Sequence, residues 1–196
     1  SGIPASFDGF AVLDINDDTI FAPGETVVFS VAVKNFGRAT SSKPMLIELS
    51  NPSSGLDIGA GRDSLVGIPG QSRTVVTKAL PIRIKQTVID GAREKVTATL
   101  VYDGKVLGRQ ELGISVSLPY SVTAVNVSSI VTAETDNKVQ VSVRNRSSKT
   151  SSKPVTVKLI SLDGLARVDG PLKNVGAIPA GQTATAEFVF TFPKEN

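Results

Sequence analysis

A stretch of 14 residues occurs twice in this chain, and it constrains the fold more than any other feature. Residues 31–44 read VAVKNFGRATSSKP, and residues 141–154 read VSVRNRSSKTSSKP. Corresponding residues are 110 positions apart, as Asn35 and Asn145 are. Repetition at a fixed spacing is typical of tandem domains, and this spacing is an ordinary domain length. We therefore expect two modules of the same fold, residues 1–118 and 119–196.

The residues used in both modules are those of β-strands. Val, Ile and Thr recur in short runs, and Gly, Pro, Asn, Asp and Ser separate the runs. Hydrophobic residues make up 40% of the chain, which is enough to form a buried core. About seven short strands in a module of about 100 residues are typical of an immunoglobulin-like sandwich. The sequence thus predicts an all-β chain of two tandem immunoglobulin-like β-sandwich domains.

The clearest strand of the first module covers residues 26–35. Phe29, Val31 and Val33 alternate there with more polar residues, so we expect one buried and one solvated face. Asp103-Gly104 predicts a two-residue hairpin turn, because both positions of such a turn need a positive φ. Residues 56–65 are predicted to be irregular because they are rich in Gly. The predicted strands of this module are residues 10–16, 26–35, 45–50, 73–84, 95–102 and 105–118.

The second module repeats this pattern up to Phe192 and has no counterpart of the last hairpin. We expect its first strand at residues 122–131, and its Val139, Val141 and Val143 correspond to Phe29, Val31 and Val33. Three explanations of the missing hairpin remain open. The native domain continues past Asn196, other strands close a smaller sandwich, or another chain supplies a strand to the open edge, which would otherwise be an aggregation hazard.

Four turn-and-strand motifs resemble one family of bacterial domains. They are GETVVFSVAVKN at residues 24–35, the strand that follows, IPGQ at residues 68–71 and YDGKV at residues 102–106. In these features the chain resembles the cell-adhesion-related (CARDB-like) immunoglobulin-like modules, and similar repeats occur in bacterial and archaeal surface proteins. The resemblance implies an extracytoplasmic spacer or adhesion module in the periplasm or at the cell surface. It implies no shared catalytic residues.

The residues that are absent exclude several kinds of chemistry. The chain has no Cys and no His, which excludes disulfides, thiolate nucleophiles, Cys/His zinc sites and imidazole triads. The net charge of +3 does not indicate a nucleic-acid partner, and no aromatic residues are interleaved with the basic ones of residues 138–153. The apolar runs are too short to insert into a membrane. We expect no enzyme activity and no cofactor.

An acidic cluster in the first module is a weak candidate for a Ca²⁺ site. Asp14, Asp17 and Asp18 lie around Asn16, and Ca²⁺ binds carboxylate and carbonyl oxygens. The cluster lacks the spacing, the central Gly and the distal Glu of an EF-hand loop. The alternative is a solvated turn whose Asp and Asn side chains accept hydrogen bonds from their own backbone. Our interpretation favours the turn, and we assign no metal.

Basic side chains gather at the repeated connection in both modules. If the two connections align, they would form a stripe that could bind an anionic glycan, phospholipid headgroups or an acidic protein. The alternative is a solvated loop rich in Ser and Thr. The candidate interaction residues are Lys34, Arg38, Lys43, Arg144, Arg146, Lys149 and Lys153.

Two further motifs, at Asn126 and Asn145, fit the acceptor pattern for N-glycosylation, which is short and frequent by chance.

The function expected from the sequence is a non-catalytic spacer or protein-interaction segment of an exported bacterial envelope or surface protein. Its partners would be other protein domains or envelope components. One alternative is a glycan-binding accessory module of a larger secreted enzyme, although the chain has no Trp and only two Tyr for an aromatic platform. Another is an assembly subunit that forms a homo-oligomer through the open edge of its second module.

Overall fold

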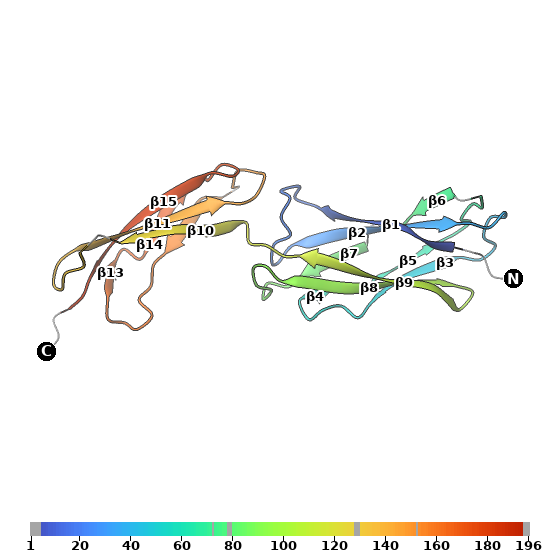
Figure 1. Cartoon of the computed structure of the whole chain (residues 1–196), viewed down its shortest axis with the longest axis horizontal. Coiled ribbons are helices and arrows are strands. Elements are labelled where there is room, and N and C mark those ends of the chain that lie inside the picture. The colour runs from blue at the N-terminus through green and yellow to red at the C-terminus, as the bar shows by residue number, and fades with distance from the viewer. Residues whose placement is uncertain (1–4, 72, 78–79, 128–129, 152, 194–196) are drawn as a thin grey trace. The chain divides into compact units, whose positions relative to one another are not determined.

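The structure is a computed structural model of the 196-residue chain, and it describes residues 5–71, 73–77, 80–127, 130–151 and 153–193. The chain divides into two compact units, Ser1–Leu118 and Pro119–Asn196. Every regular element of the described residues is a β-strand (Figure 1). No helix among them is long and apolar enough to cross a bilayer. The predicted all-β, tandem-sandwich fold is confirmed.

The first module consists of two antiparallel sheets. In one sheet the order is β1-β2-β7-β4, with β6 also paired to β2, and in the other it is β5-β3-β8-β9. These orders correspond to the two sheets of an immunoglobulin constant-type domain, with β5 added to the second sheet. The strands are β1 (Ala5–Asp14), β2 (Thr26–Asn35), β3 (Met45–Ser50), β4 (Leu56–Asp57), β5 (Arg62–Leu65), β6 (Arg73–Val76), β7 (Leu80–Ile84), β8 (Arg93–Tyr102) and β9 (Lys105–Ser115).

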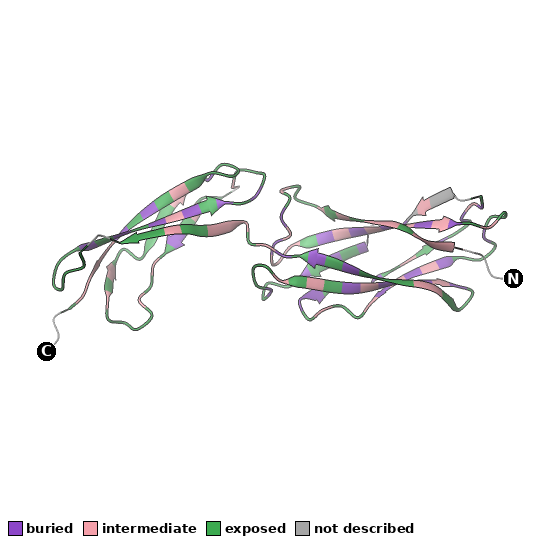
Figure 2. Cartoon of the chain, viewed as in Figure 1, coloured by how far each residue is buried: buried purple, intermediate pink, exposed green. Residues whose placement is uncertain are grey.

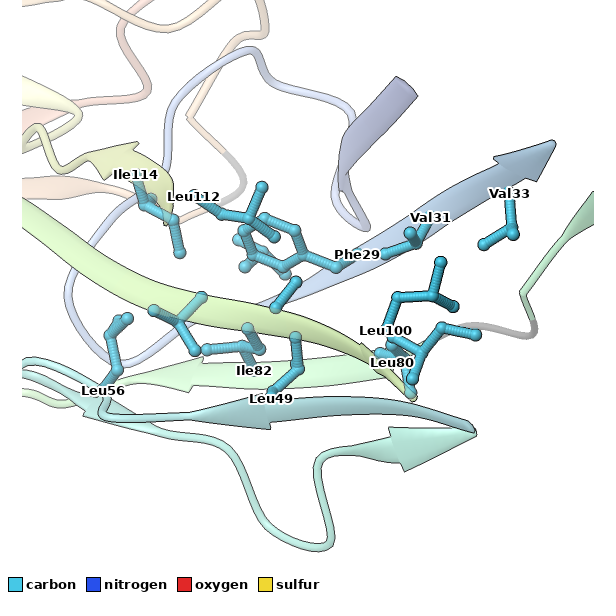
Figure 3. Close-up of a cluster of buried hydrophobic side chains, with 14 of the residues drawn as sticks. Phe29, Val31, Val33, Leu49, Leu56, Leu80, Ile82, Leu100, Leu112 and Ile114 are labelled. Atoms are coloured by element: carbon cyan, nitrogen blue, oxygen red, sulfur yellow. The ribbon is translucent and has the colours of Figure 1, made fainter. Parts of the chain in front are cut away.

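The core of this module lies between the two sheets. Alternate residues of β2 are buried, as predicted from the period of two, and Phe29, Val31 and Val33 are fully enclosed. Figure 3 shows these side chains converging with those of β7, β8 and β9, including Leu100 and Ile114. Each fully buried apolar side chain of this size stabilises the fold by about 1.5–3 kcal/mol. Packing between the two sheets therefore holds the module together.

The predicted hairpin turn is confirmed. Asp103 has a φ of 50° and Gly104 a φ of 73°, and the turn joins β8 directly to β9. Positive φ at both turn positions matches the right-handed twist of the strands. The hairpin therefore forms where the local sequence predicts it.

Two predictions about local structure in the first module were wrong. Residues 56–65, predicted to be irregular, contain β4 and β5. Residues 73–84 form two strands, β6 and β7, and residues 78–79 lie outside the described part of the chain. Between the pairs Ala32↔Val76 and Phe29↔Leu80, the β6–β7 side carries one residue more than β2. The hydroxyl of Thr77 accepts a 2.9 Å hydrogen bond from the N–H of Val31 at this irregularity.

The second module has a four-stranded sheet of order β10-β11-β15-β13 and a two-stranded sheet, β12-β14. Its first strand begins two residues earlier than predicted and ends at Val127, and residues 128–129 of the predicted strand lie outside the described residues. The strands are β10 (Tyr120–Val127), β11 (Asn137–Asn145), β12 (Val155–Lys158), β13 (Arg167–Asp169), β14 (Leu172–Gly176) and β15 (Thr183–Thr191).

Strand pairing extends the repeat to the first strand of each module. Ala5 pairs with Asn35, and Tyr120 pairs with Asn145. The register shifts at the same place in both, between Phe7 and Gly9 in β1 and between Val122 and Ala124 in β10. By this register Phe7, Phe10 and Val12 correspond to Val122, Val125 and Val127.

Within the described residues, the second module has no counterpart of β8 and β9 (Figure 1). Among the described residues, its core cluster contains 7 buried apolar side chains, whereas that of the first module contains 21. Figure 2 shows β10 as exposed or intermediate along its length. The second module therefore has the first sheet of an immunoglobulin-like sandwich and only part of the second.

Candidate interaction surfaces

The repeated asparagine of each module is fully buried and holds two chain segments together. The amide of Asn35 donates to the carbonyl oxygens of Ala39 (3.0 Å) and Ile68 (3.1 Å), and its oxygen accepts from the N–H of Gly37 (2.9 Å). Because an unpaired buried amide would be costly, this side chain fixes the connection after β2 against the loop before β6.

The second module repeats these hydrogen bonds. Asn145 donates to the carbonyl oxygens of Lys149 (2.7 Å) and Ile178 (2.9 Å) and accepts from the N–H of Ser147 (2.9 Å). The hydroxyl of Ser151 accepts from the N–H of Ile178 at 2.8 Å, as that of Ser41 does from Ile68 at 2.9 Å. The shared asparagine and serine of the two copies thus stabilise the fold, because their side chains are engaged by the backbone.

The same burial bears on the two glycosylation motifs. Asn145 is 0% exposed and its side-chain nitrogen makes two hydrogen bonds, so an oligosaccharide cannot be attached to it in the folded module. Asn126 is exposed on β10. The third residue of that motif, Ser128, lies outside the described residues.

The acidic cluster of the first module forms a hydrogen-bonded turn after β1. The Asp14 carboxylate accepts from the N–H groups of Asn16 (3.2 Å), Asp18 (2.8 Å) and Thr19 (2.9 Å). Asp18 accepts from Ile20 at 2.9 Å, and Asp17 has a φ of 57°. Within the described part of the chain, no three acidic side chains are grouped so that they could hold a metal ion. The carboxylates act as caps of the turn.

Glu25 lies beside this turn, and the pKa of its carboxyl is raised. Its two oxygens accept hydrogen bonds from the amide of Asn16 (2.7 Å) and the N–H of Ala22 (2.8 Å). Partial burial raises the pKa of Glu25, and the charges of Asp18 and Asp14 raise it further, whereas the two hydrogen bonds lower it. The net shift is upward because desolvation is the largest effect.

The basic residues of the first module lie in different surroundings. Lys34 is half-buried, and its ammonium lies 5.7 Å from the centroid of the Phe36 ring. Arg38 is exposed in the connection. Lys43 forms an exposed ion pair with Asp103 of the hairpin turn, which raises the pKa of Lys43 and lowers that of Asp103.

The basic residues of the second module are all exposed: Arg144, Arg146, Lys149 and Lys153. Arg144 donates through Nε to the carbonyl oxygen of Gly181 at 3.2 Å, which orients its guanidinium over the loop before β15. Lys138, the second residue of β11, pairs with Glu187 at 2.9 Å. A single stripe across both modules stays a prediction.

One surface was not identified from the sequence. On β10 the side chains of Val122, Val125 and Val127 are 62%, 57% and 48% exposed. Their counterparts in the first module are half-buried against the core. The connection between β12 and β13 adds Leu162 and Leu165, which are 94% and 62% exposed. The sequence signal for this surface is the missing final hairpin, since its strands cover the same positions in the first module.

Comparison with known proteins finds distant structural likenesses. No known family and no curated protein matches the sequence. Among solved structures, an alpha-2-macroglobulin of Salmonella is 12% identical with a TM-score of 0.38, over 95% of this chain and 14% of that one. A transglutaminase of red sea bream is 14% identical with a TM-score of 0.37, over 99% of this chain and 28% of that one. The chain thus spans less than a third of either protein, and no argument is drawn from a likeness at these TM-scores.

Proposed function

We propose that the chain is a non-catalytic spacer and protein-interaction segment of an exported bacterial envelope or surface protein. The observation that supports the spacer role is that Leu118 and Pro119, the two residues at the junction of the modules, are each held by a hydrogen bond. The N–H of Leu118 donates to the Asp90 carboxylate at 2.8 Å within the first module. The carbonyl oxygen of Pro119 accepts from the N–H of Arg146 at 2.7 Å within the second. No unanchored residue separates these two bonds, whereas a flexible linker would have several.

The use of the repeated polar residues supports the same function. Asn35, Ser41, Asn145 and Ser151 are shared between the copies and are engaged in hydrogen bonds to the backbone. A duplicated binding or catalytic site would repeat polar groups with free hydrogen-bonding capacity. What is duplicated here is a way to fix loops, which suits a module whose role is to hold other parts at a distance.

The spacer role can be tested by measuring the distance distribution between the modules. The chain has no Cys, so spin labels can be placed at chosen positions, such as Arg109→Cys with Lys173→Cys. The pair Arg109→Cys with Ser64→Cys, within the first module, is the control. We expect the inter-module distribution to be nearly as narrow as the control and to broaden when four glycines are inserted after Leu118. An equally broad distribution with and without the insertion would contradict the spacer role.

The extracytoplasmic setting rests on the resemblance to CARDB-like modules, and it has its own test. In intact cells of the source bacterium, the native protein should be cleaved by an added protease, or released with the periplasm. Recovery in the cytoplasmic fraction, protected until the cells are lysed, would overturn this part of the proposal and leave the spacer role standing.

A further inference from the structure

The β8–β9 hairpin covers three surfaces of the first module. The first is the edge of β3, to which β8 pairs from Met45↔Tyr102 to Ser50↔Thr97. The second is the inner side of β1, where Gly108 of β9 faces the Phe7 ring so closely that a Cβ would lie 3.9 Å from it. The third is the connection after β3, described next.

That connection is tied to β8 by three hydrogen bonds. The N–H of Ser53 donates to the carbonyl oxygen of Lys95 (2.8 Å), and the N–H of Lys95 donates to the hydroxyl of Ser53 (2.8 Å). The N–H of Gly55 donates to the carboxylate of Glu94 at 3.2 Å. The hairpin is therefore an integral part of this module.

No described residue of the second module covers the three corresponding surfaces in the way that the hairpin does in the first. β12 pairs with β14 through one edge, and no described strand pairs with its other edge. The inner residues of β10, Val122, Val125 and Val127, are about half exposed or more. The connection after β12, which corresponds to the tied segment of the first module, presents Leu162 and Leu165 to solvent.

In the first module, apolar side chains cover the equivalent surface. The inward side chains of β8 and β9 are apolar at alternate positions, and they are Val96, Ala98, Leu100, Tyr102, Leu112 and Ile114. A single strand could form backbone hydrogen bonds with the edge of β12, but its side chains would not reach those of β10. Two strands joined by a tight turn are needed to cover both.

We propose that the second module is a receptor for a β-hairpin that pairs antiparallel with β12 and packs on Val122, Val125 and Val127 of β10. The register follows from the repeat: Val155, Val157 and Leu159 take the places of Met45, Ile47 and Leu49, which lie opposite Tyr102, Leu100 and Ala98. Apolar side chains of the hairpin then fill the space between the two sheets. This inference is independent of the spacer role, since it concerns how the second module closes.

The order of elements in the repeat identifies the source of the hairpin. In the first module β8 follows β7 after a short connection, residues 85–92. β15 corresponds to β6 and β7, since it pairs with β11 as they pair with β2. The hairpin is therefore the polypeptide segment directly C-terminal to β15, and not a strand of a second copy or of another protein.

The test compares the 196-residue chain with one extended along its native gene by a segment as long as residues 85–115. Amide hydrogen exchange is measured for β10 and β12, with β2 and β3 of the first module as the internal reference. We expect the extension to slow exchange at the open edge of β12 by at least tenfold. It should also abolish binding of a hydrophobic dye and leave the first module unchanged.

A pair of substitutions on β10 makes the test specific. Val125 faces the proposed hairpin, and Asn126 is the adjacent exposed residue on the other face. Since Val125 is already 57% exposed, Val125→Lys should leave the unfolding of the 196-residue chain unchanged. In the extended chain it should remove the added protection of β12, whereas Asn126→Lys should have no effect.

Three outcomes would overturn the inference. The first is that the extension does not change the rate of amide exchange in β12 and β10. The second is that Val125→Lys and Asn126→Lys change the exchange of β12 in the extended chain equally. The third is that light scattering shows dimers of the 196-residue chain in which β12 is protected, which would make a second copy the occupant. Failure of any kind here leaves the inter-module distance measurement unaffected.

Discussion

The side-chain amide of Asn145 donates a 2.9 Å hydrogen bond to the carbonyl oxygen of Ile178, 33 residues further along the chain. The same bond joins Asn35 to Ile68 in the first module at 3.1 Å and across the same interval. Each asparagine ends the strand that forms the centre of its module and holds a distant loop against that strand. The recurrence explains why the pattern Val-x-Asn is kept in both copies although residues 36–39 differ from residues 146–149.

Replacing Asn145 with Ala should unfold the second module selectively. The substitution removes three buried hydrogen bonds: two from the side-chain amide to the carbonyl oxygens of Lys149 and Ile178, and one from the N–H of Ser147. Loss of such buried bonds costs roughly 2–4 kcal/mol, a large share of the stability of a small module. A urea titration followed by amide NMR measures the unfolding of each module separately. Asn126→Ala, at an exposed position, is the control, and equal effects of both substitutions would contradict the role of Asn145.

Gly104→Ala should destabilise the first module through the hairpin turn. Gly104 has a φ of 73°, and a residue with a Cβ in this region costs about 1–2 kcal/mol. Gly113→Ala on β9 is the matched control, because its φ is ordinary and the nearest atom to a new Cβ is 4.0 Å away. Thermal unfolding should show a lower midpoint for Gly104→Ala alone. A comparable loss at Gly113 would mean that the turn is not the cause.

The carboxyl of Glu25 should titrate at a higher pH than an exposed glutamate. Its pKa is raised mainly by partial burial and then by Asp18 and Asp14. A carboxyl whose folded-state pKa is raised stabilises the fold when protonated, so this contribution is lost as the pH rises from the ordinary pKa through the raised one.

The titration is followed by NMR of the side-chain carboxyl carbon. Asp18→Asn should shift the midpoint of Glu25 downward, because it removes a neighbouring charge while its side-chain oxygen can still accept from Ile20. Asp17→Asn removes one charge from the same turn and should shift it less. A midpoint for Glu25 at or below that of an unstructured glutamate would contradict the predicted environment.

Exposed Lys149 and Lys153 should govern any binding to polyanions. Charge reversal of both, Lys149→Glu with Lys153→Glu, should leave the unfolding midpoint unchanged, because both side chains are exposed. It should lower the salt concentration at which the chain elutes from a polyanion column. Lys105→Glu with Lys173→Glu gives the same net charge at other exposed positions. Equal elution of the two variants would show that only net charge matters and that the basic segment is not a site.

Much of the fold follows from local sequence signals. The alternation around Phe29 identifies a half-buried strand because burial of one face needs a period of two. Asp103-Gly104 identifies a hairpin because few residue pairs tolerate two positive φ values. β4 and β5 could not be found in this way. β4 has two residues and β5 four, which is too short for a period to be read, and tertiary pairing alone defines them.

The surfaces were harder to predict than the strands. Asn35 and Asn145 were recognised as repeated, but their burial depends on loops 33 residues away. The apolar face of β10 has an ordinary strand sequence. Burial of such a face depends on strands that are distant in sequence, as β8 and β9 are from β1 in the first module. A local sequence pattern therefore does not show whether Val125 is exposed. Pairing of β10 with β11 was needed to match Val125 with Phe10 of the first module.

The shared β-bulge has a consequence for biosynthesis. β1 and β10 both lie at a sheet edge, and each carries one extra residue, Asp8 and Thr123, at the same register position. A bulge bends and twists an edge strand, which makes it a poor template for a further strand. Neighbouring copies of one fold emerge from the ribosome in succession and are prone to exchange strands before they are complete. We therefore expect the bulge in the outer strand of each copy to disfavour strand exchange between the two repeats while they fold.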